Sequence, residues 1–227
     1  IPSLKQPPDP TPFTLSRVIG EMREVFGNRS YLMLVFGALF ASVAGGFSDV
    51  VGLYMGTYFW GFRSEQIATM GLFLVIALLA GVGLARPVSQ RFDKRRTAIL
   101  LATTGIFFGP LPIFLRLLGW MPPNGHPVLL PLLIGHSILL VTGMIVLGIL
   151  RASMIADVVD ENELVTGKRQ EGMFSSVIAF TSKATSGIGG FLAGIALDVI
   201  AFPTHAAPGT VGDDKLFRLG IAVGPCM

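Results

Sequence analysis

Long apolar runs separated by short polar segments set the pattern of this chain. Five runs, at about residues 31–60, 66–86, 97–118, 128–151 and 173–202, exceed the ~20 residues that a helix needs to cross a bilayer. A sixth run begins at residue 216 and ends with the sequence, so we expect a span that is cut short. The apolar residues come in blocks rather than in amphipathic stripes. The pattern predicts an all-α polytopic membrane protein.

A polar segment precedes the first apolar run. The prolines between Pro7 and Pro12 oppose helix formation, so we expect a linker there. Residues 16–29 have the spacing of a short amphipathic helix that connects this linker to the membrane. We therefore divide the chain into a connector, residues 1–29, and a transmembrane bundle, residues 30–227. The sequence has neither a signal peptide nor an initiator methionine, and we expect it to begin inside a longer protein.

The charged residues predict the orientation of the bundle. They make up 14% of the chain, and the mean hydropathy is +0.68, whereas a soluble domain carries roughly 25% charge. If the N-terminus is cytoplasmic, most Lys and Arg residues fall on the inner side, and Trp60 and Trp120 fall at outer ends of spans. We expect a cell membrane, such as a bacterial inner membrane. The net charge of +3 gives no reason to expect a nucleic-acid partner.

One lysine lies deep in the last full span. Between residues 173 and 202 the only other charge is Asp198, and a cation in the middle of a span costs about 3 kcal/mol. On a helical projection Lys183 shares one side with small residues, namely Ser176, Ala179, Ser186, Gly187, Gly190 and Gly194. Small residues allow close helix contact or leave room for a ligand, so Lys183 is the first candidate for a functional site. The alternative is a packing seam whose lysine snorkels to the inner interface.

The first span offers three further candidates. Asp49 lies on a face with several glycines, and it would neutralise Lys183 if the two met across the bundle, although their expected depths differ. The alternative is a carboxylate solvated in an outer vestibule. Tyr54 and Tyr58 follow near the outer end of this span, where their rings suit stacking on a sugar. They suit an interfacial aromatic belt equally well.

The polar segment after the fourth span is the most specific part of the sequence. Charges of both signs are dense there, among them Asp157, Asp160, Glu163, Arg169 and Glu171. We expect a loop, and contacts that form in one conformation and break in another would make it a cytoplasmic gate. The alternative is a solvated connector.

The same segment carries a family resemblance. The pattern Asp157-x-x-Asp160-x-x-Glu163-x-x-Thr166-Gly167-x-Arg169-x-Glu171-Gly172, followed by a span with Lys183, resembles the C-terminal half of the glycoside–pentoside–hexuronide:cation symporters. These symporters are a branch of the major facilitator superfamily. The pattern in this segment is specific, and the remaining agreement, over nearly the whole chain, lies in hydropathy and spacing.

The resemblance assigns parts of a twelve-helix transporter to this chain. Residues 1–29 would be its cytoplasmic middle loop and adjoining helix, and the spans would be helices seven to eleven with the start of the last. Lys183 would match the family's helix-eleven lysine, which lies near the sugar and cation sites. Residues 91–96 would match the basic loop between helices eight and nine, although Asp93 stands where glycine is usual.

The resemblance implies cation-coupled symport of a sugar or glycoside by alternating access. The coupling ion would be Na⁺ or H⁺, and no bound cofactor is expected. The partners would be the substrate, the missing N-terminal half and the lipid bilayer. Two alternatives stay open. The protein is a carrier of a lipid-like or other amphiphilic substrate, or it is a non-transporting receptor or assembly protein on the same fold.

Other kinds of chemistry have little support in the sequence. The three histidines and the single cysteine are not grouped as metal ligands. The sequence has no phosphate-binding glycine loop and no Ser/His/Asp arrangement, so we expect no enzyme. His136, inside the fourth span, is either a proton carrier or, as we favour, a polar group satisfied between helices.

Overall fold

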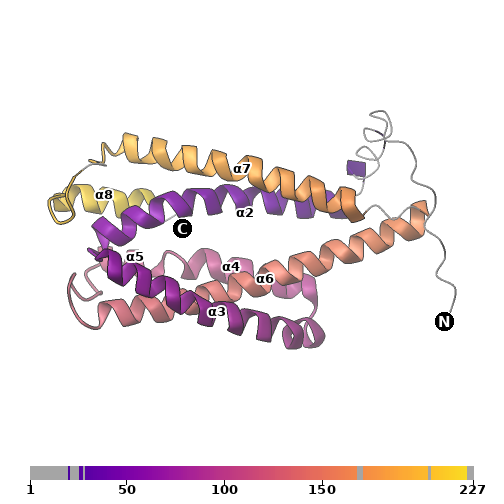
Figure 1. Cartoon of the computed structure of the whole chain (residues 1–227), viewed down its shortest axis with the longest axis horizontal. Helices are drawn as coiled ribbons and strands as arrows, with labels where there is room; N and C mark the ends of the chain where they lie inside the picture. The colour runs from indigo at the N-terminus through magenta and orange to yellow at the C-terminus, as the bar shows by residue number, and fades with distance from the viewer. Residues whose placement is uncertain (1–19, 21–25, 28, 168–170, 204–205, 224–227) are drawn as a thin grey trace.

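The computed structural model describes residues 20, 26–27, 29–167, 171–203 and 206–223. This part of the chain is a bundle of helices without strands, and its long helices lie nearly along one axis (Figure 1). In chain order the elements are α2 Arg29–Tyr54, the π-helix η1 Met55–Phe59, α3 Ser64–Arg91, α4 Lys94–Phe108, α5 Leu111–Leu117, α6 Leu129–Thr166, α7 Glu171–Val199 and α8 Asp213–Val223. The predicted amphipathic helix at residues 16–29 lies almost entirely outside the described residues.

Four segments of the described chain are both long enough and apolar enough to cross a membrane. They are Arg29–Phe59, Ser64–Arg91, Lys94–Leu117 and Leu129–Val165. Helix α7 has 29 residues and sufficient length, but Lys183, Asp198 and many Ser, Thr and Gly residues make it less apolar than those four. The predicted fold class, an all-α polytopic membrane protein, is confirmed.

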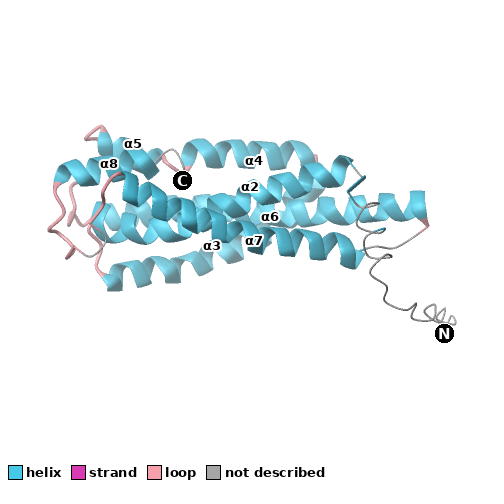
Figure 2. Ribbon diagram, turned by 90° about the horizontal axis from the view of Figure 1, so that it is seen from above, coloured by secondary structure: helices cyan, strands magenta, loops and turns pink. Residues whose placement is uncertain are grey.

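The helices form two layers. One layer holds α2, α7 and α8, and the other holds α3, α4, α5 and α6 (Figure 1). The connections η1–α3, α5–α6 and α7–α8 gather at one end of the bundle (Figure 2). We call this the aromatic end, because it holds η1 and Trp60. The opposite end, where α3 gives way to α4 between Arg91 and Arg96, is called the basic end.

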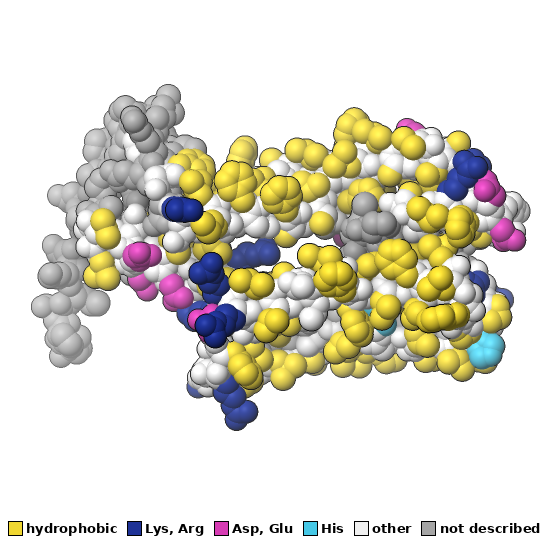
Figure 3. All heavy atoms as spheres, turned by 180° about the vertical axis from the view of Figure 1, so that it is seen from behind, with side chains coloured by type: hydrophobic (Ala, Val, Ile, Leu, Met, Phe, Trp, Pro, Cys, Tyr) yellow, Lys and Arg dark blue, Asp and Glu magenta, His cyan; other side chains and the backbone are white. Residues whose placement is uncertain are grey.

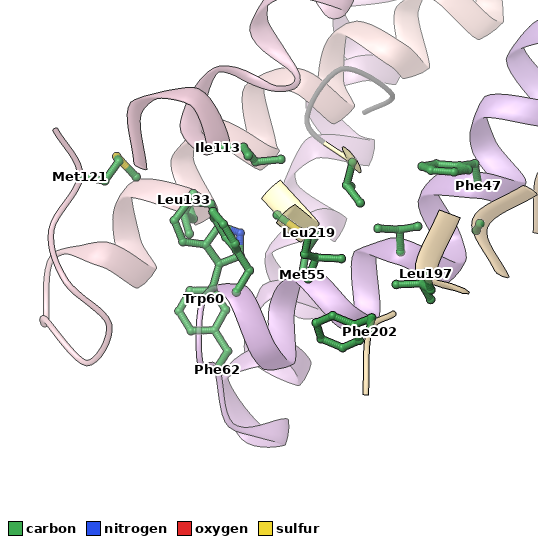
Figure 4. Packing of buried hydrophobic residues seen from close by; sticks show 14 of the residues in the cluster. Phe47, Met55, Trp60, Phe62, Ile113, Met121, Leu133, Leu197, Phe202 and Leu219 are labelled. Carbon is green, nitrogen blue, oxygen red and sulfur yellow. The ribbon is translucent and has the colours of Figure 1, made fainter. Parts of the chain in front are cut away.

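Two hydrophobic clusters join the layers, one at each end. The cluster at the aromatic end draws on α2, η1, α7 and α8 and on the start of α6, and it includes Met55, Leu133, Leu197 and Leu219 (Figure 4). The cluster at the basic end combines α2, α6 and α7, and its buried members are Tyr31, Val35, Val158, Val159, Phe174 and Val177. The hydroxyl of Tyr31 donates to the carbonyl of Phe174 over 2.7 Å, so a polar contact also fixes the start of α7 against the start of α2.

Helices α2 and α7 run parallel and make the closest backbone contact in the described bundle through glycines. A methyl group at Gly46 would overlap the carbonyl of Ser186, and one at Gly189 would overlap the carbonyl of Val43. Because the obstructing atoms are backbone, no rotamer change relieves these overlaps. Small residues are what permit helices to approach so closely in a membrane.

The third predicted span is broken within its length. Helix α4 ends at Phe108 and α5 begins at Leu111, with Pro110 between them. Pro112 has no N–H group, so the carbonyl of Phe108 loses its usual donor four residues on. The Nε2–H of His136 on α6 donates to this carbonyl instead, over 2.7 Å. His136 is therefore a polar group satisfied between helices, as favoured from the sequence.

The fourth predicted span continues far beyond residue 151. Helix α6 has 38 residues and reaches Thr166, so the expectation of a loop over Asp157 to Glu163 is wrong. Dense charge marks where a helix leaves the apolar region, but Asp and Glu do not end a helix. The helix ends where Gly167 adopts φ 69°, a left-handed conformation that favours glycine, and donates to the carbonyl of Glu163 over 2.8 Å.

Candidate functional site

Lys183 lies on an open strip of α7. Its side chain is exposed, on a side of the helix turned away from the contact between Gly189 and α2. Gly187 and Gly194 share this side, and a methyl group at either position would meet no atom within 4 Å. The strip of Lys183, Gly187 and Gly194 thus combines a charge with unfilled space along a helix that lies among apolar spans. Ser186 and Gly190 also fall on this side, and both pack against α2: the Ser186 carbonyl approaches Gly46, and a methyl group at Gly190 would lie 3.6 Å from Val50. The small residues of this side thus form a packing seam at one edge and an open strip beside it.

The other charge of this layer, Asp49, is exposed on α2 but does not meet Lys183. A methyl group at Gly190 would lie 3.6 Å from Val50, so Asp49 and Gly190 are nearly level along the parallel helices. Lys183 lies seven residues before Gly190, which corresponds to roughly 10 Å along the axis. No ion pair joins Asp49 and Lys183, both of which are described. The direct pair considered from the sequence is therefore wrong, because the two residues occupy different depths.

Tyr54 and Tyr58 belong to an aromatic group at the aromatic end. Their rings stack with centroids 6.0 Å apart, and Phe202, after the end of α7, makes edge contacts with both at 5.8 and 5.2 Å. The hydroxyl of Tyr58 donates to the carbonyl of Ala206 over 2.9 Å. The π-helix η1 sets this arrangement because its wider turn contains Tyr58, and such turns occur frequently at functional sites.

A hollow of about 240 Å³ adjoins these tyrosines and is lined by Leu53, Tyr54, Thr57 and Tyr58. Ring faces beside hydroxyl groups suit a polyhydroxylated ligand. A second hollow of about 470 Å³ lies at the same end, between the start of α3 and the α5–α6 connection, and includes Arg63, Glu65 and His126. The latter is on the loop surface, away from Lys183.

An ion pair links the polar end of α6 to the basic end of α4. Lys94 Nζ lies 2.7 and 3.0 Å from the two carboxylate oxygens of Asp157. Both side chains are partly exposed, so water can compete for each of them. This pair is the kind of contact that can form and break as helices move, and it joins two segments that lie 63 positions apart.

The remaining charged candidates occupy both sides of the α6–α7 connection. Asp160 and Glu163 follow Asp157 on α6, and Glu171 is the first residue of α7. Each of these three makes further interactions. Arg169 lies outside the described residues. Three of the five residues expected to form the gate, Asp157, Asp160 and Glu163, thus lie on the last turns of helix α6 rather than on a loop.

Two residues of the site, Phe202 and Lys94, and one half-buried cation outside it, Arg151, were not singled out from the sequence. Phe202 lies beyond the last full span, and its apolar character alone gives no sign that it contacts Tyr54 and Tyr58. Lys94 lies in a visibly basic stretch, but the choice of Asp157 as its partner depends on tertiary packing. Arg151 falls at the predicted end of a span, and only the continuation of α6 to Thr166 shows that it is internal to a helix.

The described residues contain no group of three potential metal ligands among His, Cys, Asp and Glu. The geometry therefore offers a charged open strip, an aromatic group and a breakable ion pair.

Comparison with known proteins gives consistent results. Residues 2–227 match the profile of the family described as MFS/sugar transport protein. An uncharacterized symporter of Synechocystis is 26% identical over 212 residues, which cover 92% of this chain and 37% of that protein. The uncharacterized symporter YjmB of Bacillus subtilis is 28% identical over 193 residues, which cover 85% of this chain and 39% of that protein. The chain thus spans less than half the length of these relatives.

Proposed function

This chain belongs to the MFS/sugar transport protein family, and we propose that it forms the C-terminal half of a secondary transporter that works by alternating access. The transporter would carry a sugar or glycoside by symport with Na⁺ or H⁺, as a member of the glycoside–pentoside–hexuronide:cation branch. The two relatives bear the name symporter, which supports coupling to an ion. The family and these names point to a transporter rather than an enzyme.

The observation that carries the proposal is the open strip around Lys183. A cation with unfilled space beside it is costly on a lipid-facing surface, and it is usually retained where it meets water, protein or a ligand. The N-terminal half of the transporter, facing this strip, would complete an aqueous cavity near the middle of the membrane. Lys183 would then contact the substrate or couple its binding to the ion.

Each end of the bundle would have its own part in alternating access. We propose that the basic end is cytoplasmic, because Lys and Arg residues concentrate there, and that the protein resides in a cell inner membrane. The pair of Lys94 and Asp157 would help to close that side and separate when it opens. At the other end, Tyr54 and Tyr58 would line the outer part of the pathway.

The test is gradient-driven uptake by the full-length protein in proteoliposomes. Labelled sugars would be offered under a Na⁺ gradient, a proton gradient or no gradient. We expect accumulation of at least one sugar above its outside concentration in one gradient, and loss of accumulation in Lys183→Gln. Arg95→Gln, which removes an exposed cation far from the strip, is the matched control. Accumulation by Lys183→Gln at the wild-type level would refute the assigned site, and absence of gradient-driven uptake would refute symport.

A further inference from the structure

The π-helical turn η1, which contains Tyr58, depends on contacts made at its end. π-Helices are rare and occur mostly as single turns within α-helices. In η1 the N–H of Trp60 donates to the carbonyl of Met55, five residues back, over 2.9 Å. A return to the ordinary α-helical turn would move the residues after η1 by one position, about 100° around the axis. The contacts that end η1 therefore decide where its side chains point.

The chain leaves η1 through a tight turn at Gly61. This glycine adopts φ 64°, a left-handed conformation, and the N–H of Phe62 donates to the carbonyl of Gly56 over 2.9 Å. A methyl group at Gly61 would lie 3.1 Å from the Nδ2 atom of Asn124. The connection between α5 and α6, which holds Asn124, thus lies directly against the end of η1.

Asn124 supplies a hydrogen bond that η1 does not make within itself. The last carbonyls of a helix have no intrahelical donor, and Phe59 is the last residue of η1. The Nδ2–H group of Asn124 donates to the carbonyl of Phe59 over 3.1 Å. Phe59 is buried, which limits the replacement of this donor by water. Loss of the Asn124 amide would therefore remove a constraint on the end of η1.

Arg116, on α5, fixes the orientation of the Asn124 amide. Its guanidinium donates from one nitrogen to the carbonyl of Pro122 over 2.6 Å and from another to the Oδ1 atom of Asn124 over 2.9 Å. Because Arg116 donates to Oδ1, the amide nitrogen is the atom that faces the carbonyl of Phe59. The forked guanidinium suits such a two-point contact. Arg116, Asn124 and the Phe59 carbonyl thus form a chain of hydrogen bonds, which we call the amide link.

The amide link lies at the aromatic end of the bundle. This end carries charged side chains and a histidine beyond the mostly hydrophobic flank (Figure 3). Asn124 is exposed and Arg116 is half-buried. The hollow of about 240 Å³ is lined instead by residues of α2 and η1, among them Thr57 and Tyr58. The amide link therefore acts on a ligand in that hollow through the conformation of η1.

We propose that Asn124 and Arg116 are positioning residues for the outer part of the transport pathway. By holding η1 in its π-helical form, they keep Tyr58 against Phe202 and Ala206 and preserve the hollow that receives the solute. This inference rests on the proposed transport function, and it names two residues beside the pathway that set the affinity of its outer site.

The first test is a double-mutant cycle that needs no solute. Purified full-length protein is unfolded thermally as wild type, Tyr58→Phe, Asn124→Ala and the double variant. If Asn124 places Tyr58, the Tyr58 hydroxyl no longer reaches Ala206 in Asn124→Ala. Tyr58→Phe should then lower the Tm at most about half as much as it does in the wild type. In Arg218→Gln, which removes an exposed cation at the same end, Tyr58→Phe should lower the Tm by its full amount.

A second variant covers the case in which Asn124→Ala fails to fold. Arg116→Lys keeps the charge but has no fork, so we expect it to diminish the effect of Tyr58→Phe in part. Additive Tm losses in both cycles would overturn the inference.

The second test separates affinity from turnover. Labelled D-xylose, D-galactose and methyl β-D-galactoside are offered to proteoliposomes of the full-length protein under a Na⁺ or a proton gradient. For a sugar that accumulates, Asn124→Ala should raise the KM at least about fivefold, the factor to which one hydrogen bond of ordinary strength corresponds. Vmax should change less than about twofold, and Arg218→Gln should leave both values unchanged. An unchanged KM in Asn124→Ala would overturn the inference. Absence of uptake for all three sugars would count against the proposed transport function, whereas the cycle would still decide the role of the amide link.

Discussion

Replacing Gly189 by alanine tests the packing on which the α2–α7 layer depends. The added methyl group would overlap the carbonyl of Val43 and lie 2.7 Å from the backbone nitrogen of Phe47. Both obstacles are main-chain atoms, so the helices have to separate. Insertion of a methyl group into a packed interior destabilises the fold by about 1–3 kcal/mol. The higher helix propensity of alanine offsets up to about 1 kcal/mol of this loss.

Gly187→Ala is the matched control, two residues away on the same helix. Its methyl group meets no atom within 4 Å, so only the favourable propensity term applies. We expect Gly189→Ala to be about 1–3 kcal/mol less stable than Gly187→Ala. For a domain of this size, each kcal/mol corresponds to about 2–4 °C in Tm.

The assay is thermal unfolding of the detergent-solubilised protein, followed by tryptophan fluorescence. The Tm of Gly189→Ala should fall below that of the wild type, and the Tm of Gly187→Ala should equal or exceed it. A Gly187→Ala variant that is destabilised as much as Gly189→Ala would show that the helix face was assigned wrongly. Unchanged Tm in both would show that α2 and α7 do not touch through Gly189.

Three further outcomes are expected. Asp157→Asn should change the free energy of unfolding by less than about 1 kcal/mol, because its ion pair with Lys94 is partly exposed. It should nevertheless alter the uptake rate. Exchanging the two charges, as Lys94→Asp with Asp157→Lys, should restore that rate. Tyr58→Phe should lose about 1 kcal/mol in thermal unfolding, whereas Tyr54→Phe, whose hydroxyl has no hydrogen bond among the described contacts, should lose little. His136→Ala should lose about 1–3 kcal/mol by leaving a helix carbonyl unsatisfied, and an unchanged Tm would contradict that role.

Much of the fold follows from the sequence because bilayer thickness imposes a simple length rule. Apolar runs predict where helices exist, and α3 Ser64–Arg91 covers the expected second run. Helix ends follow different physics. Phe108 and Leu111 flank a break set by proline, and Thr166 ends α6 because Gly167 takes a left-handed conformation. A hydropathy profile shows neither the proline break nor the helix end at glycine.

The sequence identifies a candidate site residue when that residue is unusual by itself, but it does not show which residues contact one another. Lys183 is conspicuous because a charge in an apolar run is costly, and the structure places it on an open strip. The partner of Asp157 proved to be Lys94, far away in sequence, and Asp49 proved too distant in depth for Lys183. Helical projection gives the face of a residue but not its level relative to another helix. The level depends on packing contacts such as that of Gly46 with Ser186.

The most direct test of the central claim is the reactivity of cysteines placed on two sides of α7. The claim is that the strip of Lys183, Gly187 and Gly194 faces a water-filled pathway. In full-length protein freed of other reactive cysteines, Gly187→Cys and Ile188→Cys are treated with a membrane-impermeant maleimide in native membranes. Ile188, the next residue, lies about 100° further around the helix and is 51% exposed among apolar side chains, where lipid would surround it. The account predicts rapid labelling of Gly187→Cys and none of Ile188→Cys. Equal labelling, or labelling of Ile188→Cys alone, would contradict it.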